Sequence, residues 1–326
     1  MTGFAPLLSI RNLSIRFGAG SRWSCPVDGV SLDIAPGEVL ALVGESGSGK
    51  SITALSMTGL LPEGTSEVAA DVMTFDGVSL LGDTLRGQAL RGREIAYIFQ
   101  DPLGSLNPVV RVGRQIEEAV RLHAPGTIPR EEAYGLLRRV GLEPAEQIAR
   151  AYPHELSGGM QQRVMMAMAL AGKPRLLIAD EPTTALDVTV QAKVMSLLGS
   201  LQQDLGMAIL LITHNLGLAA GFAGRIAVMY AGRIVEAGPV EDVLTAPRHP
   251  YTQALLQAVP RLGDGRRRRE GIPGRVPHPS CYPSGCRFHP RCSRATQQCH
   301  DQTPPLQTFG AGHHGTCHHP VEHAHA

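Results

Sequence analysis

The chain has 326 residues, of which 43% are hydrophobic and 18% are charged, a composition typical of a globular protein with one large domain and an appendage. Its formal net charge of +1 excludes a strong overall attraction to nucleic acid. No segment approaches the roughly 18 to 20 consecutive apolar residues of a spanning helix, and the first residues lack the layout of a signal peptide, so we expect a cytoplasmic protein.

The N-terminal part of the chain has the pattern of a strand-rich segment that leads into an α/β sheet. Residues 6–40 alternate apolar and polar side chains, which predicts antiparallel strands with one buried face. Val39–Val43 is a short apolar run, and a helical pattern follows over 51–61. Between them, Gly44–Ser51 reads GESGSGKS and matches the phosphate-binding pattern GxxxxGK[ST].

This pattern gives each of its residues a chemical role. Lys50 can reach the β- and γ-phosphate oxygens of ATP, and the Ser51 hydroxyl can bind Mg²⁺. The alternative, a glycine-rich turn that merely precedes Lys-Ser, does not explain the strand and the helix on either side. The remaining candidate ligands turn their backbone N–H groups toward the phosphates, and they are Gly44, Ser46, Gly47 and Gly49.

Two further apolar runs, 176–179 and 208–213, predict buried strands, with a helical pattern between them. The first run ends in Asp180 and Glu181. Because the carboxyl ends of parallel strands open on one crevice, Asp180 can reach the Mg²⁺ at Ser51. Glu181 can act as the general base for water, which is worth about 10² to 10⁴ in rate. Taken alone, the pair could also be a simple turn at the end of a strand.

The region from about 101 to 170 is predicted to be mainly helical, and it contains the segment LSGGM at 156–160. Ser157 can cap a helix while Gly158 and Gly159 expose N–H groups at its positive end, which predicts a second phosphate site. The segment resembles the LSGGQ signature of the ABC ATPase family, with Met160 in place of the final Gln. In that family, the signature of one subunit closes over the ATP held by the other.

The resemblance implies roles for four more residues. Gln100 resembles the Q-loop glutamine that contacts Mg²⁺ and water and reports to the membrane subunit, and Asp187 falls in a segment that resembles the D-loop. His214 resembles the switch histidine that contacts the γ-phosphate. Phe17 resembles the A-loop aromatic that stacks on adenine, although Trp23 lies close in sequence and a strand Phe is usually core.

The resemblance also implies the fold class, an α/β P-loop ABC ATPase. It combines a parallel core sheet, an N-terminal antiparallel β subdomain, a helical subdomain inserted at about 101–172 and a small Cys-rich C-terminal extension. We expect the nucleotide-binding domain to span 1–245 and the extension 246–326. Beyond about residue 240 the strand patterns stop, and one more helix is predicted at 247–259. The rest is too poor in apolar residues for a core of its own, so a metal cross-link would explain its folding.

Three segments place the chain within the family. QDPLGSLNP at 100–108, DEPTTALDVTVQ at 180–191 and HPYT at 249–252 resemble the importers of dipeptides, oligopeptides and nickel. This resemblance implies an ATPase subunit on the cytoplasmic face of the inner membrane that powers peptide import. Its implied partners are two permease subunits, an extracytoplasmic substrate-binding protein and a second ABC ATPase subunit, expected in a homologous heterodimer. The alternative cargo is nickel or a metallophore.

Two rival classes explain the motifs less well. An ABC ATPase that acts on nucleic acid usually carries two cassettes or a long coiled coil, and neither is present. A metal-binding module with a degenerate nucleotide site would not need Lys50, Asp180, Glu181 and His214 together.

Five of the six cysteines lie in the last fifth of the chain, whereas Cys25 stands alone. Disulfides are improbable in a reducing cytosol, so the group indicates a metal or iron–sulfur centre. The resemblance to peptide importers, which includes CRFHPRC at 286–292, implies a [4Fe–4S] cluster, with zinc as the alternative and Cys281 as an unligated neighbour. The four expected ligands have the spacing C-x5-C-x6-C-x17-C and are Cys286, Cys292, Cys299 and Cys317.

Two charged or titratable tracts in the extension leave alternatives open. The run 266–269 consists of arginines and is interpreted as a solvated linker rather than a binding patch. The last residues are rich in histidine, which indicates either a solvated tail or the handling of nickel or a metallophore. These histidines are His313, His314, His318, His319, His323 and His325.

Overall fold

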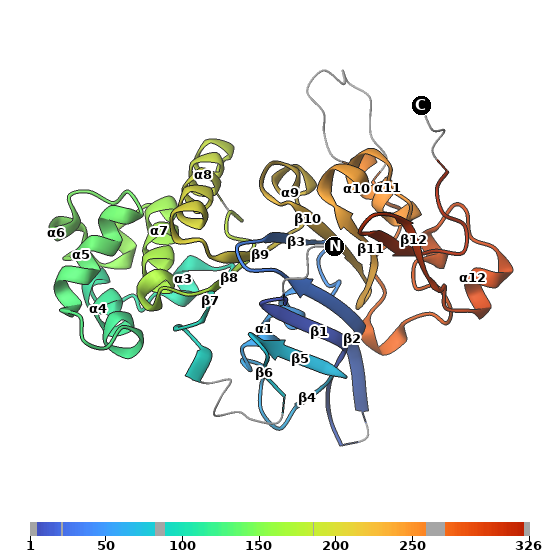
Figure 1. Cartoon of the computed structure of the whole chain (residues 1–326), viewed down its shortest axis with the longest axis horizontal. Helices are drawn as coiled ribbons and strands as arrows, with labels where there is room; N and C mark the ends of the chain where they lie inside the picture. The colour runs from blue at the N-terminus through green and yellow to red at the C-terminus, as the bar shows by residue number, and fades with distance from the viewer. Residues whose placement is uncertain (1–4, 21, 82–88, 185, 259–270, 323–326) are drawn as a thin grey trace. The chain divides into compact units, whose positions relative to one another are not determined.

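The computed structural model describes residues 5–20, 22–81, 89–184, 186–258 and 271–322, which form two compact units. The first unit combines the described parts of 1–34, 39–82 and 212–326, and the second those of 35–38 and 83–211 (Figure 1). Among the described residues, no helix has both the length and the apolar character needed to cross a membrane. The arginine run at 266–269 lies outside the described residues.

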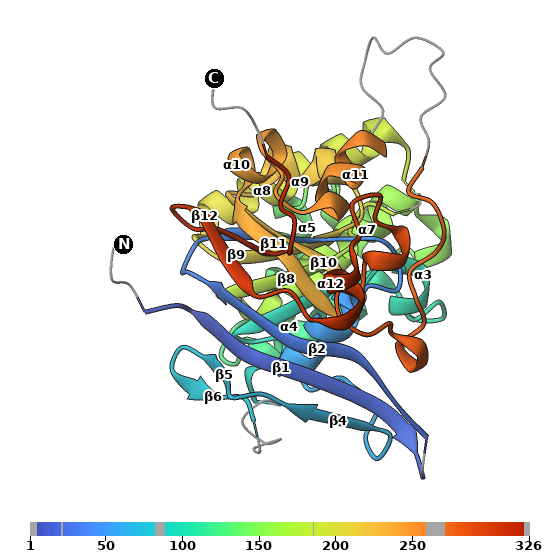
Figure 2. The same ribbon diagram turned by 90° about the vertical axis from the view of Figure 1, so that its right-hand side faces the viewer.

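An antiparallel sheet built from the N-terminal strands belongs to the first unit (Figure 2). Its longest strands, β1 and β2, pair from Leu8 opposite Ile34 to Ala19 opposite Arg22. Leu8 and Ile10, and then Leu13 and Ile15, are buried on β1, which confirms the alternation seen in the sequence apart from the register shift between Ile10 and Leu13. The strand order is β2-β1-β5-β6, and β4 also pairs with β1. The strands are β1 (Leu8–Ala19), β2 (Arg22–Ile34), β4 (Ser66–Ala69), β5 (Val72–Phe75) and β6 (Val78–Ser79).

The first unit also contains the strand that leads to the phosphate loop. This strand, β3, pairs in parallel with β10, and the order in this unit is β12-β13-β11-β10-β3. The expectation that strands stop near residue 240 was wrong, because β12 and β13 follow much later. Their sequences, LQTFG and HHGT, lack apolar alternation, so the pairing of β13 with β11 could not be read from the pattern. The strands are β3 (Val39–Val43), β10 (Arg225–Tyr230), β11 (Arg233–Pro239), β12 (Leu306–Gly310) and β13 (His313–Thr316).

The helices of the first unit are short. The helix after the phosphate loop, α1, ends at Met57 rather than at residue 61, because Gly59 takes a left-handed φ of 60°. The helix predicted around 247–259 is confirmed as α11. The helices are α1 (Lys50–Met57), α9 (Leu216–Phe222), α10 (Val240–Thr245), α11 (Pro250–Ala258) and α12 (Gln297–Asp301).

The C-terminal extension shares a core with the strands of the first unit. Tyr251 and Phe288 are 0% and 3% exposed, and both pack against Tyr230 of β10, with ring centroids 4.6 and 5.2 Å from it. These aromatic rings stabilise the extension by packing, whereas the sequence had indicated a metal cross-link for that purpose.

The second unit places helices beside a short parallel sheet with the order β9-β8-β7. Strand β7 (Ile95–Ile98) pairs in parallel with β8 (Leu176–Asp180), and β9 (Ala208–Thr213) runs from this unit into the first. The runs predicted at 176–179 and 208–213 are thereby confirmed as strands. Both were recognisable because every residue of β8 and β9 is buried.

The helices of this unit confirm the amphipathic patterns of the sequence. In α4, Val112, Ile116 and Val120 recur every four residues and are fully buried. Figure 1 shows α4, α5 and α7 gathered side by side, and their mutual contacts agree. The helices are α3 (Pro102–Ser105), α4 (Val112–His123), α5 (Pro129–Arg139), α6 (Ala145–Ile148), α7 (Gly158–Ala169) and α8 (Val188–Leu205).

Candidate nucleotide site

The phosphate loop of the first unit can be built only with glycines at several positions. Gly44, Gly47 and Gly49 have φ angles of 156°, 80° and 107°. A Cβ at Gly44 would lie 2.1 Å from the carbonyl oxygen of Met229, and one at Gly49 would lie 2.9 Å from that of Pro26. The loop is therefore packed against neighbouring backbone while it turns its own N–H groups.

The side chain of Lys50 lies along the same loop. Lys50 is 5% exposed, and its Nζ donates to the carbonyl oxygens of Gly44 at 2.8 Å and Glu45 at 2.9 Å. Ser46 is exposed at the outer bend of the loop, whereas Ser51 is half-buried in the first turn of α1. The loop turns its amides inward, and the lysine stands at the start of the helix that follows. This arrangement suits a polyphosphate.

The two acidic residues of the second unit stand at the end of β8. Asp180 is 5% exposed, and its Oδ2 accepts a hydrogen bond of 2.8 Å from Tyr97 Oη on β7. Burial and the neighbouring carboxylate raise the pKa of Tyr97 well above its ordinary value, so the phenol keeps its proton and donates. Tyr97 was not predicted, although a single phenol within an apolar strand was the available signal.

Glu181 is held by two polar side chains. Its Oε2 accepts hydrogen bonds from Gln100 Nε2 at 3.0 Å and Thr184 Oγ1 at 2.8 Å, and its φ of 46° is uncommon for a residue other than glycine. The structure thus brings together Gln100 and Glu181, which the sequence analysis had placed in the same reaction. Thr184 was not predicted.

The signature segment forms the start of α7 in the second unit. Ser157 is the N-cap, and its hydroxyl accepts from the Met160 N–H at 3.4 Å, as predicted. A Cβ at Gly159 would lie 2.7 Å from Val190 Cγ1, so this glycine also lets α8 approach α7. Gly158 is exposed at the first position of the helix.

Asp187, Phe17 and His214 occupy different surroundings. Asp187 is the N-cap of α8, and its Oδ1 accepts from two backbone N–H groups. Phe17 is half-buried on β1, whereas Trp23 on β2 is 41% exposed and donates to the Gly20 carbonyl at 3.0 Å. His214 is exposed, directly after β9.

The four cysteines expected to bind a cluster influence one another electrostatically. Burial, and then the charges of the other three thiols, raise the pKa of Cys317 to about 12. The Cys286 N–H donates to the Cys299 carbonyl at 2.8 Å, and Cys281 is exposed. All four are free thiols. Among the described residues, however, no group of three or more His, Cys, Asp or Glu side chains has the geometry of a metal site.

The histidine-rich end of the chain is more ordered than either interpretation of the sequence allowed. His313 lies in β13 and is 4% exposed, and its Nε2 is 2.8 Å from Glu236 Oε1, so the solvated-tail interpretation was wrong for this residue. His318 and His319 also contact other parts of the extension, at the Gln302 carbonyl and at Thr296 Oγ1. Burial lowers the pKa of His314, and His323 and His325 lie outside the described residues.

The comparisons with known proteins agree with this geometry. The sequence pattern of the family "ABC transporter" matches residues 27–184, and that of "Oligopeptide/dipeptide transporter, C-terminal region" matches 235–299. The dipeptide transport ATP-binding protein DppD of Escherichia coli is 47% identical over 98% of each chain. A Brucella abortus protein named for peptide import and ATP binding is 48% identical over 94% of this chain and 93% of its own length.

Solved structures place the fold in the same family. A dimeric, post-hydrolysis structure of the ATP-binding cassette MJ0796 bound to ADP and Pi has a TM-score of 0.62 at 28% identity, covering 72% of this chain and 98% of that one. CbiO1 of Clostridium perfringens, part of the transporter complex CbiONQ, has a TM-score of 0.60 at 26% identity, covering 74% of this chain and 92% of that one. The chain therefore belongs to the ABC transporter family as one of its ATPases, and it carries the C-terminal region of the oligopeptide and dipeptide transporters.

Proposed function

We propose that this ATPase binds MgATP and uses its hydrolysis to power the import of dipeptides or oligopeptides. Two observations together carry the proposal. Lys50 lies along the phosphate loop, and relatives named for peptide import are 47–48% identical over nearly the whole chain. We propose a nucleotide-binding domain at 1–245, with a helical subdomain at about 101–172, and an extension at 246–326.

The residues of the first unit bind the nucleotide in this proposal. The amides of the phosphate loop from Gly44 to Gly49, with Ser46 and Gly47 between them, surround the β-phosphate, and Lys50 moves its ammonium from loop carbonyls to the β/γ oxygens. Phe17 stacks on the adenine, and His214 contacts the γ-phosphate.

Magnesium fits the donors that the chain offers. A hydroxyl from Ser51, a carboxylate from Asp180 and an amide oxygen from Gln100 are the hard oxygen ligands that Mg²⁺ prefers. The bond from Tyr97 fixes the direction of the Asp180 carboxylate. When bound, the ion would neutralise charge on the phosphates.

Glu181 is the proposed general base. Its carboxylate takes a proton from the attacking water, and Gln100 and Thr184 hold it in one orientation until then. Because Gln100 lies two residues after the end of β7, a movement of this segment changes the position of both the glutamine and the base.

A second ATPase subunit completes the site in our proposal. Ser157, Gly158 and Gly159 present the positive end of α7 to an ATP held by the partner, while Asp187 starts α8 beside them. The dimeric MJ0796 cassette supports such a pair. The partner is proposed to be a homologous chain in a heterodimer, and a homodimer is the competing outcome of a mass measurement on the assembled transporter.

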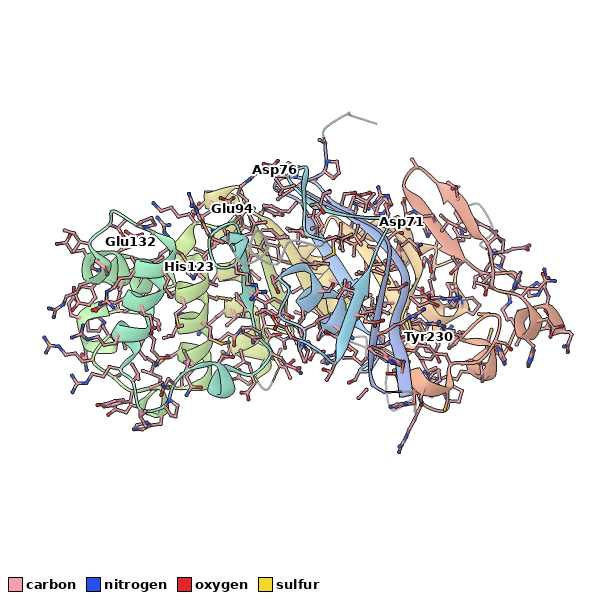
Figure 3. The ribbon with its side chains drawn as sticks, turned by 90° about the horizontal axis from the view of Figure 1, so that it is seen from below. Asp71, Asp76, Glu94, His123, Glu132 and Tyr230 are labelled. Carbon is pink, nitrogen blue, oxygen red and sulfur yellow. The ribbon has the colours of Figure 1, made fainter. Side chains whose placement is uncertain are left out.

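The second unit offers an apolar hollow for a permease. The hollow has a volume of about 420 Å³ and is lined in part by Phe99, the residue before Gln100. We propose that one of the two permease subunits inserts an apolar segment here, on the cytoplasmic face of the inner membrane. An extracytoplasmic binding protein would deliver the peptide. The side chains that line the hollow include Tyr97, Phe99, His123, Met165 and Met168, and His123 is marked in Figure 3.

The cysteines of the extension are proposed to hold a [4Fe–4S] cluster with a structural role. The support is the donor chemistry: four thiols in the extension match what such a cluster requires, although the described side chains do not form a metal-site geometry, and zinc is the alternative. Iron and sulfide analysis of the isolated protein tests this point, with Cys317→Ser expected to lose the iron and Cys281→Ser to keep it. Stoichiometric zinc without iron would decide for the alternative. The ligands would be Cys286, Cys292, Cys299 and Cys317.

Transport by the reconstituted complex tests the proposed cargo. Proteoliposomes that contain both ATPases, the permeases and the binding protein should take up dipeptides or oligopeptides when ATP is present on the ATPase side. The relatives named for peptide import favour this cargo over nickel. Uptake of Ni²⁺ without uptake of any peptide would reverse the assignment.

A further inference from the structure

The carboxylate of Glu45, the second residue of the phosphate loop, is held by an arginine from the far end of the chain. Arg291 Nη1 is 2.8 Å from Glu45 Oε2, and Arg291 Nη2 is 3.0 Å from Oε1, so the two groups form a bidentate pair. The Arg291 side chain is 5% exposed and that of Glu45 is 30% exposed. A pair with this geometry fixes the position of the loop, unlike most surface ion pairs.

Arg291 is itself fixed by its surroundings. Its Nε donates to the Pro273 carbonyl at 2.7 Å, and its two terminal nitrogens also reach the Tyr230 hydroxyl at 3.4 Å and the Ile272 carbonyl at 3.3 Å. With the two bonds to Glu45, all five N–H donors of the guanidinium have acceptors. The side chain therefore has little freedom to turn away from the loop.

The backbone of Glu45 is held by the extension as well. Its N–H donates to Tyr251 Oη of α11 at 2.9 Å, and Tyr251 is fully buried against Tyr230 and Phe288. Figure 3 marks Tyr230 beside the extension. Glu45 also accepts Lys50 Nζ on its carbonyl oxygen at 2.9 Å. One residue thus joins Arg291, Tyr251 and the phosphate-binding lysine.

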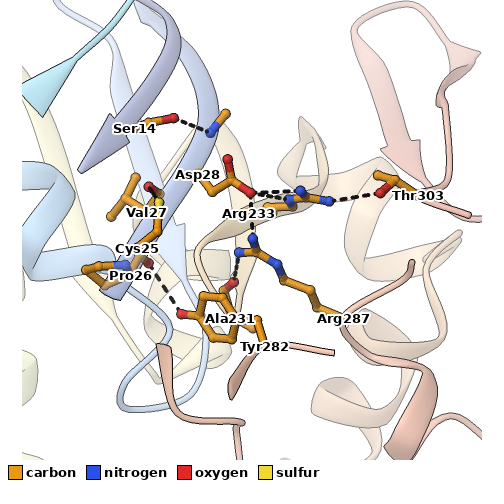
Figure 4. Close-up of polar contacts among 11 residues, drawn as sticks. Ser14, Cys25, Pro26, Val27, Asp28, Ala231, Arg233, Tyr282, Arg287 and Thr303 are labelled. Atoms are coloured by element: carbon orange, nitrogen blue, oxygen red, sulfur yellow. Dashed lines mark hydrogen bonds and ion pairs between the residues drawn. The ribbon is translucent and has the colours of Figure 1, made fainter. Parts of the chain in front are cut away.

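The segment that bears Arg291 has a second anchor. We call 286–292 the cysteine segment, because it begins with Cys286 and ends with Cys292. Arg287 Nη2 is 2.5 Å from Asp28 Oδ2, and its Nη1 donates to the Ala231 carbonyl at 2.6 Å. Figure 4 shows the Asp28 carboxylate paired with both Arg287 and Arg233. The cysteine segment is thereby held at both ends.

We propose that the cysteine segment positions the phosphate loop through Arg291 and Glu45 and thereby sets the affinity for nucleotide. A loop that is already held in its turned shape loses less conformational freedom when the phosphates bind, so its affinity is higher than that of a free loop. Arg291 is a positioning residue in this account, because it acts on the nucleotide only through Glu45. The extension then has a role in ATP binding as well as in packing.

Calorimetric titration of the purified full-length chain with MgATP tests the proposal. Arg291→Met and Glu45→Gln should each raise the Kd about tenfold, the usual effect of losing a hydrogen bond to a charged group. The double variant should be no weaker than either single variant, because both remove the same link. Arg291→Lys should lie between Arg291→Met and the unchanged protein, since it keeps the charge but not the fork. In the reconstituted transporter, Arg291→Met should raise the KM for ATP and leave kcat unchanged.

Two further variants separate the possible failures. The proposal rests on the assignment of Gly44–Ser51 to the phosphates, so Lys50→Ala is the reference that must abolish binding. Arg275→Met removes an exposed arginine of the same extension and should leave the Kd unchanged. If Lys50→Ala abolishes binding while Arg291→Met and Glu45→Gln do not weaken it, this inference fails and the site assignment stands. Additive losses of affinity in the double variant would also refute the link. If Arg291→Met does not fold, Arg291→Lys and Glu45→Gln carry the test.

Discussion

The burial of His249 predicts a loss of stability in mild acid. His249 is 1% exposed, and burial lowers its pKa to about 4, although the nearby Glu236 carboxylate opposes the shift. Its Nδ1 accepts the Tyr251 N–H at 3.0 Å, a bond that requires the neutral ring. Because the ordinary pKa of about 6.5 applies in the unfolded chain, the unfolded state binds the proton first as the pH falls.

The magnitude follows from this difference in pKa. Each pKa unit corresponds to about 1.4 kcal/mol, so the contribution of neutral His249 is complete above about pH 6.5, and about 3 kcal/mol of it is lost between pH 7 and pH 4. Urea unfolding of the unchanged chain and of His249→Asn, followed by circular dichroism at several pH values, isolates this effect because the other acidic groups are common to both. The difference between their free energies of unfolding should shrink by that amount over this range. Parallel curves would refute the reasoning.

Two further predictions concern the nucleotide site. Tyr97→Phe removes the 2.8 Å bond to Asp180 and should raise the Mg²⁺ concentration needed for half-maximal ATPase activity about tenfold, whereas Tyr134→Phe should not; an unchanged Mg²⁺ requirement would contradict the positioning role of Tyr97. Gly44→Ala should cost about 2–4 kcal/mol in the free energy of unfolding, since its Cβ would lie 2.1 Å from the Met229 carbonyl oxygen. Gly47→Ala has no atom within 4 Å of its Cβ and should cost less, and equal losses in thermal denaturation would show that the clash is relieved.

The sequence predicted those parts of the fold that local patterns encode. The phosphate loop and the strands β3, β8 and β9 were found because apolar runs and glycine spacing are properties of neighbouring residues. The strand β13 was missed because HHGT gains its stability from backbone pairing with β11 and from the contact between His313 and Glu236, which lie 77 residues apart.

Contacts over long separations explain what the sequence could not predict about the site. Glu45 and Arg291 are 246 residues apart, and no sequence motif predicted an ion pair for either residue. Tyr97 and Asp180 meet because their strands are neighbours in the sheet, which only the strand order reveals. Glu181 was predicted from its place at the end of an apolar strand and Gln100 from the family resemblance, whereas the hydrogen bond between them is a finding of the structure.

The proposed role of Glu181 as general base is the central claim about chemistry, and Glu181→Gln tests it most directly. In the complex with its partner ATPase and permeases, this variant should bind MgATP with a Kd close to that of the unchanged protein and lose at least about a hundredfold in ATP turnover. Glu241→Gln, an exposed glutamate of α10, serves as the matched control and should keep full turnover. Undiminished ATP turnover in Glu181→Gln would contradict the account.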